Sequence, residues 1–100
     1  SYQSDASLAG SAFGDVHAYP NPVREGYTGV ITITGLVDNT HVKITDLNGN
    51  LVNQTISNGS LATWDAKDVH GRKVNTGIYL AICVNEDGTQ STITKIMIIN

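Results

Sequence analysis

The sequence predicts an all-β protein, an antiparallel sandwich or barrel of about seven strands, and three observations support this. Short segments alternate between apolar and polar residues, which is the period of a half-buried strand. Turn-forming pairs such as Asn-Gly and Asp-Gly recur between these segments about every ten residues. Valine, isoleucine and threonine, which favour strands, are frequent in the alternating segments. Short strands closed by tight turns are typical of sandwiches and barrels rather than of folds that alternate strands with helices.

The composition sets limits on size and on partners. The 100 residues, with a mass of 10.6 kDa, are enough for one domain with one ordinary core. The net charge of -3 and the scattered basic residues argue against nucleic acid as a partner. No apolar run approaches the roughly 20 residues of a membrane-spanning helix, so no transmembrane segment is predicted. The single cysteine, Cys83, excludes an internal disulfide.

The chain is predicted to divide after residue 14. Residues 1–14 are rich in serine, alanine and glycine, which is typical of a linker from an upstream domain. The folded domain is predicted to span residues 15–100. Its first strand, at about 16–19, is followed by Pro20 and Pro22, which lack the N–H group that a central ladder needs. This strand is therefore expected at a sheet edge.

The next strands follow from strict alternation. Segments 29–35 and 41–45 place two aliphatic pairs on one face each, namely Ile31 with Ile33 and Val42 with Ile44. Segments 50–56 and 60–64 complete the first half of the domain. Tight type I′ hairpin turns, which need positive φ at both central residues, are predicted at Asn48-Gly49, Asn58-Gly59 and Asp87-Gly88.

Residues 64–77 follow neither a strand nor a helix period and are predicted to cross from one sheet to the other. Trp64, the only tryptophan, is expected to fill the core where the sheets meet. Asp65 can fold its carboxylate back onto the N–H groups of the next two residues in an Asx-type turn. Gly71 follows a predicted turn, and Gly77 is expected to let the chain bend into a strand at 78–84.

A metal loop is the alternative for this crossing segment. Asp65, Asp68 and His70 are ligand types for Ca²⁺ or a transition ion, but their spacing matches no known loop and lacks the glutamate of an EF-hand. Turn formation is the preferred interpretation, and no metal site or cofactor is predicted.

No arrangement of residues in the sequence indicates a catalytic site. Cys83 shares a strand face with Tyr79 and Ala81, and no neighbouring lysine or paired histidine would lower its pKa, so a buried unreactive thiol is expected. His17 and His41 fall in strand patterns and are expected to be solvent-facing or satisfied rim residues rather than ligands. The domain is accordingly predicted not to be an enzyme.

The last strand, at 92–100, is apolar on both faces near its end. Lys95 is its only charged residue, with Ile93, Met97 and Ile99 on one face and Ile96 and Ile98 on the other. Two interpretations are open: both faces are covered within the fold, or one face or the free edge is kept for a partner.

Four segments in this order resemble the C-terminal sorting domain of the type IX (Por) secretion system, which is related to the Ig-like repeat of flagellar hook-capping proteins. They are "AYPNPV" (18–23), "VKITDLNGNLV" (42–52), "TWDAKDVHGRKVNTGIYLAICV" (63–84) and "TKIMIIN" (94–100). The stretch "YPNPVREGYTGVITITGL" looks most like the version on propeller-bearing surface proteins, in which the domain is retained. One departure is Ala66, where the family usually has glycine after "WD".

The resemblance implies an Ig-like β-sandwich at the end of a larger exported protein of a Gram-negative bacterium. It implies passage through the periplasm to the cell surface or the extracellular space. The implied partners are the secretion translocon in the outer membrane, sortase-like proteins, surface lipopolysaccharide and the upstream domain of the same chain. The residues that match the family's recognition signals are Gly77, Tyr79, Lys95, Ile96, Met97, Ile98 and Ile99.

Two other functions are weighed against this export module. A carbohydrate-binding module needs exposed coplanar aromatics, and Tyr19 and Tyr27 are the available candidates, because Trp64 and Tyr79 are expected to be buried. A plain spacer would need no partner at all, and any Ig-like domain could replace it.

Overall fold

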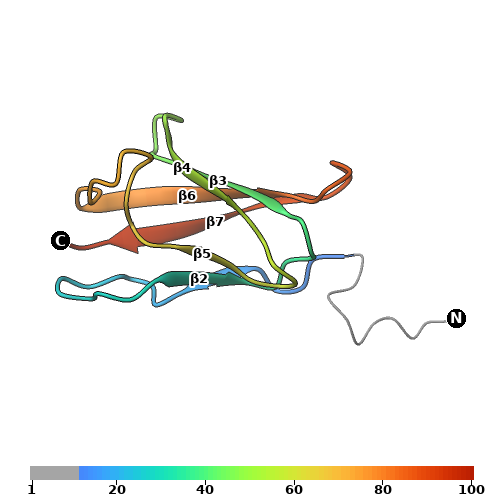
Figure 1. Cartoon of the computed structure of the whole chain (residues 1–100), viewed down its shortest axis with the longest axis horizontal. Helices are drawn as coiled ribbons and strands as arrows, with labels where there is room; N and C mark the ends of the chain where they lie inside the picture. Colours follow the sequence, from blue (N-terminus) through green and yellow to red (C-terminus); the bar gives the residue numbers. More distant parts are fainter. Residues whose placement is uncertain (1–11) are drawn as a thin grey trace, which may run out of the picture.

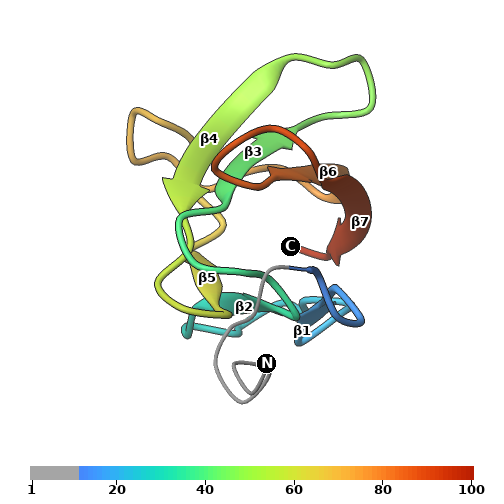
Figure 2. The same ribbon diagram turned by 90° about the vertical axis from the view of Figure 1, so that its right-hand side faces the viewer.

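The computed structural model describes residues 12–100 and shows seven strands in two antiparallel sheets that pack face to face (Figures 1 and 2). The predicted all-β sandwich of seven strands is therefore confirmed. Most of the predicted linker, residues 1–11, lies outside the described residues. The strands are β1 His17–Tyr19, β2 Ile31–Thr34, β3 His41–Thr45, β4 Leu51–Ile56, β5 Ala62–Trp64, β6 Gly77–Val84 and β7 Ser91–Ile98.

The two sheets have different sizes. The smaller has the order β1-β2-β5 and the larger β4-β3-β6-β7. β1 and β7 are edge strands of their sheets, as predicted for β1 from its prolines. The chain changes sheet between β5 and β6, so residues 65–76 are the crossing that the sequence predicted.

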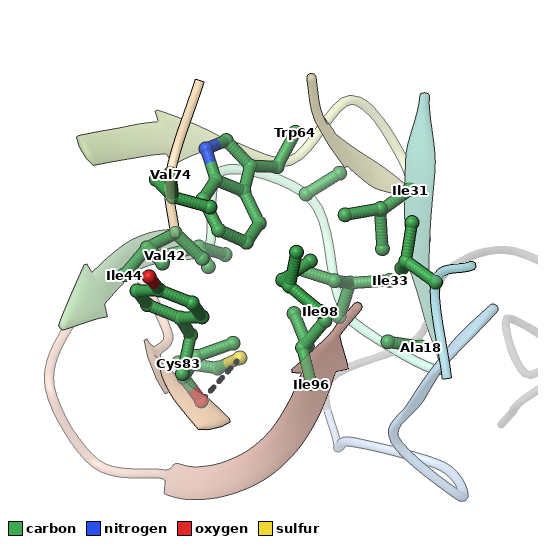
Figure 3. Packing of buried hydrophobic residues seen from close by; sticks show 14 of the residues in the cluster. Ala18, Ile31, Ile33, Val42, Ile44, Trp64, Val74, Cys83, Ile96 and Ile98 are labelled. Atoms are coloured by element: carbon green, nitrogen blue, oxygen red, sulfur yellow. Dashed lines mark hydrogen bonds between the residues drawn. The ribbon is translucent and has the colours of Figure 1, made fainter. Parts of the chain in front are cut away.

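The core lies between the sheets and follows the predicted alternation. Ile31 and Ile33 of β2 face Ile96 and Ile98 of β7 across the sandwich, and all four are at most 1% exposed (Figure 3). Val42 and Ile44 of β3 are fully buried beside them. Truncating any of these isoleucines to alanine typically costs about 2–5 kcal/mol, because the neighbours only partly fill the space left behind.

Trp64 and Tyr79 join the two sheets. Their rings meet edge to face with centroids 5.7 Å apart, and both are less than 10% exposed. Each polar atom has a partner, since Trp64 Nε1–H donates to the Lys67 carbonyl at 2.8 Å and the Tyr79 hydroxyl donates to the Asn75 carbonyl at 2.7 Å. The indole therefore fills the core as predicted and also anchors the start of the crossing segment.

The crossing segment begins with the predicted Asx turn. The Lys67 N–H donates to Asp65 Oδ1 at 3.1 Å. Ala66, between them, has a φ of 62°, which is the left-handed region that favours glycine. The family usually has glycine at this position, so this chain has an alanine side chain where the backbone conformation suits glycine best.

The same five-residue turn occurs twice, at 46–50 and 68–72. In each, the first aspartate accepts hydrogen bonds from the N–H groups two and four residues later, and its own carbonyl accepts from a glycine. Those glycines, Gly49 and Gly71, have φ values of 88° and 81°. The turn predicted after the crossing tryptophan is therefore confirmed at Gly71.

The predicted type I′ geometry at the three Xaa-Gly pairs is wrong. Positive φ occurs at Gly49, Gly59 and Gly88 but not at the residue before any of them. The connections formed by 46–50 and 85–90 are too long for a two-residue hairpin, and a register shift between Ile44 and Thr45 accompanies the first. At Asn58–Leu61 a tight turn does form, with Gly59 as its first central residue.

The described end of the predicted linker already contacts the domain. Phe13 is half-buried against the core, and its N–H donates to Gln90 Oε1 at 3.0 Å. Gly14 N–H donates to the Gly35 carbonyl at 2.8 Å. These contacts place residues 13 and 14 with the sandwich.

Candidate functional site

The last strand is the segment on which the sequence analysis placed most of its recognition residues. β7 pairs antiparallel with β6 along its whole length, from Ser91 opposite Val84 to Ile98 opposite Gly77. Ile96 and Ile98 point into the core, whereas Ile93 and Met97 are 58% and 43% exposed. One face of β7 is therefore open to solvent, and the interpretation in which both faces are covered does not hold for the folded domain.

The seven predicted recognition residues fall into two groups. Tyr79, Ile96 and Ile98 are buried in the core, with Tyr79 directly opposite Ile96. The others are Gly77, Lys95, Met97 and Ile99, which are exposed or half-exposed and lie on or beside the last two strands. Only this second group is available to a partner of the folded domain.

Gly77 has no visible structural reason to be glycine. Its φ is outside the left-handed region, and a Cβ added there would meet nothing within 4 Å. The predicted bend at Gly77 therefore does not require a missing side chain.

The outer edge of β7 is partly covered by the segment 21–23. Asn21 uses both ends of its side-chain amide, since Nδ2 donates to the Lys95 carbonyl at 2.8 Å and Oδ1 accepts from the Met97 N–H at 3.0 Å. Val23 continues the contact, because its N–H donates to the Met97 carbonyl and its carbonyl accepts from the Ile99 N–H, both at 2.8 Å. We call this arrangement the edge clasp.

The other half of the same edge is open. Backbone groups two residues apart point to the same side of a strand, so the N–H and carbonyl of Ile93 share the outward direction of Lys95 and Met97. Within residues 12–100 no hydrogen-bond partner reaches Ile93 on that side. Asn21 was not singled out in the sequence, although it lies in the "AYPNPV" segment; its partners are more than 70 residues away.

Cys83 is fully buried, as predicted. Burial raises the pKa of its thiol to about 11, so very little thiolate forms at neutral pH. His17 and His41 are exposed, also as predicted. None of these side chains forms part of a reactive cluster with the others in the geometry of the described chain.

The carboxylates of the crossing segment are engaged in turns. A hydrogen bond from the Arg72 N–H, together with one from the His70 N–H, holds the pKa of Asp68 below its ordinary value. Across residues 12–100 no three His, Cys, Asp or Glu side chains gather closely enough to hold a metal ion. Likewise, no helix among these residues is long and apolar enough to cross a membrane.

Tyr19 and Tyr27, the candidate sugar-binding aromatics, are 49% and 40% exposed. Tyr27 lines a hollow of about 250 Å³ together with Arg24 and Lys73, but its hydroxyl donates to the Val30 carbonyl at 2.8 Å. Tyr19 lies on β1, where its ring centroid is 6.2 Å from that of His17. Among residues 12–100, neither ring contacts a second tyrosine in a shared platform.

Comparison with known families decides the class of this domain. The model of the secretion system C-terminal sorting domain matches residues 17–100, which includes every strand and the edge clasp. The chain belongs to this family. No curated protein sequence matches the chain significantly.

Solved structures agree with the family assignment. PorZ of Porphyromonas gingivalis, described as an essential surface component of the type IX secretion system, superposes with a TM-score of 0.77 and 34% identity over 86% of this chain. Dimeric latent PorU of the same bacterium gives a TM-score of 0.60 with 28% identity over 83% of the chain. The BSP domain of a biofilm-associated protein gives 0.57 with 13% identity over 89% of the chain, which shows a shared fold only. The chain spans 12%, 9% and 14% of the lengths of these three proteins, respectively.

The family assignment makes this sorting domain a secretion-targeting module. Its Ig-like sandwich serves export to the cell surface or the extracellular space, and its setting is the type IX secretion machinery. Domains of this family are typically not catalytic.

Proposed function

We propose that the sorting domain directs a longer protein through the periplasm of a Gram-negative bacterium to an outer-membrane translocon, which recognises the end of the sandwich formed by β6 and β7. The observation that carries this proposal is the family match over all seven strands, combined with a last strand that leaves Met97 43% exposed at a sheet edge. The exposed recognition residues are Gly77, Lys95, Met97 and Ile99.

Export is tested by joining the 100-residue chain to the end of a reporter that otherwise stays in the periplasm. In cells with an active type IX system, the reporter is expected on the surface, where added protease degrades it. A matched fusion with an unrelated Ig-like domain tests the spacer alternative, because a spacer would permit equal display. A reporter that remains in the periplasm with the sorting domain attached would refute the proposal.

A test of recognition through β6 and β7 requires variants that still fold. Deleting residues 95–100 would remove two buried isoleucines, Ile96 and Ile98, and would therefore unfold the domain as well as remove the signal. Gly77→Ala is better, since the added methyl group meets nothing within 4 Å. Gly14→Ala is its control, because a Cβ there makes only ordinary contacts at 3.8 Å or more. Reduced display of Gly77→Ala alone would support recognition at this residue.

Sortase-like proteins and surface lipopolysaccharide are proposed as later contacts of the exported protein. The resemblance to the retained version of the domain leads us to expect that the displayed protein keeps its full mass. Removal of the whole 100-residue chain would lower the mass by 10.6 kDa, and mass spectrometry of the surface fraction distinguishes the two outcomes.

A further inference from the structure

We propose that the outer face of the β4-β3-β6-β7 sheet is a docking surface for a partner protein whose apolar contact area is bordered by carboxylates. This inference rests on the proposed export function, because it names the surface that the secretion machinery contacts. We define the outer face by the side chains that point away from the core, of which the apolar ones on β6 and β7 are Ile78, Leu80, Ile82, Val84, Ile93 and Met97.

The outer face is apolar at its centre. In β6 the buried residues Tyr79, Ala81 and Cys83 alternate with half-buried aliphatic residues that point to the outer face. The three-stranded sheet covers the opposite face, and no strand among residues 12–100 packs on the outer one (Figure 2). Ile93 at 58% and Ile56 at 54% exposure extend the patch to both edge strands. Contiguous apolar surface of this kind marks interaction sites in soluble proteins.

The charges on the outer face have one sign. Within residues 12–100 none of the side-chain carboxylates lies in a strand: Asp15 precedes β1, and the others lie in connections between strands, namely Glu25, Asp38, Asp46, Asp65, Asp68, Glu86 and Asp87. The two lysines found in strands, Lys43 and Lys95, both lie on the outer face. Lys43 pairs with Ile82 and Lys95 with Leu80, so the lysines flank the central aliphatic stripe from opposite sides.

This charge pattern favours an acidic protein surface over two other occupants. A second copy stacked face to face would bring lysines onto an equally basic face, which costs interaction free energy. A flat anionic membrane would also approach the carboxylates in the loops at the ends of this sheet, such as Asp46 and Asp87, whereas a partner protein can contact the two lysines without reaching those loops. A partner with carboxylates around an apolar centre matches both features of the face.

The shape of the outer face also favours the docking of a partner protein. An open hollow of about 580 Å³ lies over β3 and β4 and is lined by His41, Lys43, Gln54 and Ile56 among others. The open half of the β7 edge, at Ile93, adjoins the same face on its other side. A partner could therefore contact side chains across the sheet and backbone groups at its edge.

The test uses the reporter fusion with substitutions on the exposed rim of the face. Lys43→Glu combined with Lys95→Glu reverses both charges, and Ile93→Asp places a charge in the apolar patch. The controls are Lys73→Glu and Leu47→Asp, which make the same kinds of change at exposed positions off the face. Surface display is expected to fall about tenfold for the face variants and to stay unchanged for the controls. Thermal unfolding of each purified chain checks that the variants remain folded.

The outcomes separate this inference from the export function. Normal display of the face variants, with the wild-type domain still exporting the reporter, would overturn the docking surface and leave export intact. Should charge reversal destabilise the chain, Lys43→Gln with Lys95→Gln gives a milder variant, which is expected to show a smaller loss. Sedimentation and flotation with anionic vesicles address the other occupants. A dimer lost in the Ile93→Asp variant, or vesicle binding lost on charge reversal, would replace the acidic partner with a second copy or a membrane.

Discussion

Substituting Asn21 tests whether the edge clasp stabilises the last strand. Asn21→Ala removes the side-chain amide that donates to the Lys95 carbonyl at 2.8 Å and accepts from the Met97 N–H at 3.0 Å. The two backbone bonds of Val23 to Met97 and Ile99 remain, so the segment should stay in place with half of its attachment to β7.

The expected loss of stability is about 2 kcal/mol. Each hydrogen bond typically contributes about 0.5–1.5 kcal/mol net, and the site is exposed, so water replaces part of what is lost. For a domain of this size, about 1 kcal/mol shifts the unfolding midpoint by roughly 4–8 °C. We therefore expect a decrease of roughly 10 °C, with the spread that these two ranges imply.

Amide hydrogen exchange followed by NMR gives the sharper readout. The Met97 N–H points away from β6 and bonds only to Asn21 Oδ1, so its protection should largely disappear in Asn21→Ala. The Ile99 N–H, which bonds to the Val23 carbonyl, should keep most of its protection. Asn48→Ala is the matched control, because the Asn48 side chain makes no hydrogen bond in the described structure. Unchanged protection of Met97 in Asn21→Ala would refute the reasoning.

Three further predictions concern the core and the turns. Ala66→Gly removes the strain of a left-handed φ of 62°. Glycine also increases the entropy of the unfolded chain, so the net increase in the free energy of unfolding in urea should be about 0.5–1 kcal/mol. Equal or lower stability would contradict this prediction. Burial raises the pKa of Cys83 from 9.0 to about 11, so its contribution to stability is complete below pH 9 and is lost as the pH rises toward 11, by about 2–3 kcal/mol. Cys83→Ala should lack that part of the alkaline loss, which denaturation at several pH values measures. Hydrogen bonds from the turn lower the pKa of Asp46 and Asp68, so the stability they provide is present above pH 3.8 and is lost as the pH falls through their lowered values. The double variant Asp46→Asn, Asp68→Asn should unfold with a weaker acid dependence than the wild type, and an identical dependence would count against the turn hydrogen bonds.

The strands and the core could be predicted because local alternation determines them. Ile44 and Ile96 point to the one face of their sheet that is buried. Shifting either strand by one residue would turn all of its inward-facing side chains to the solvent. Trp64 could also be placed, since the only large indole in a small domain has few sites that exclude water and still supply a partner for its N–H.

The turn types could not be predicted from the Xaa-Gly pairs alone. A two-residue hairpin requires the flanking strands to stay in register up to the turn. Here the register shifts between Ile44 and Thr45, and the carboxylate of Asp46 binds two backbone N–H groups inside a longer loop. The aspartate, rather than the asparagine before Gly49, organises the turn. The repeated pattern of an aspartate three residues before a glycine was the available signal.

Whether the edge of β7 is free or covered could not be predicted from local sequence patterns, because it depends on residues far apart in the chain. The sequence showed that the last strand is apolar, but whether its edge is free depends on Asn21 and Val23, which come from the other end of the domain. The prolines around Asn21 were interpreted as the end of β1 and as a sign that β1 is an edge strand. Their second consequence is that the chain after β1 runs along β7 instead of pairing within its own sheet.

The division of the recognition residues bears on how such a signal is recognised. Tyr79, Ile96 and Ile98 hold β6 and β7 in the sandwich, and the same strands present Lys95 and Met97 outward. Because adjacent residues of a strand point to opposite faces, the buried side chains fix the position of the exposed ones. A substitution in the core would then impair sorting through the loss of this arrangement, without any contact between the buried side chain and the partner. Under the proposed function, recognition of the folded domain and its stability are coupled through a single strand, and family resemblance alone does not distinguish contact residues from supporting ones.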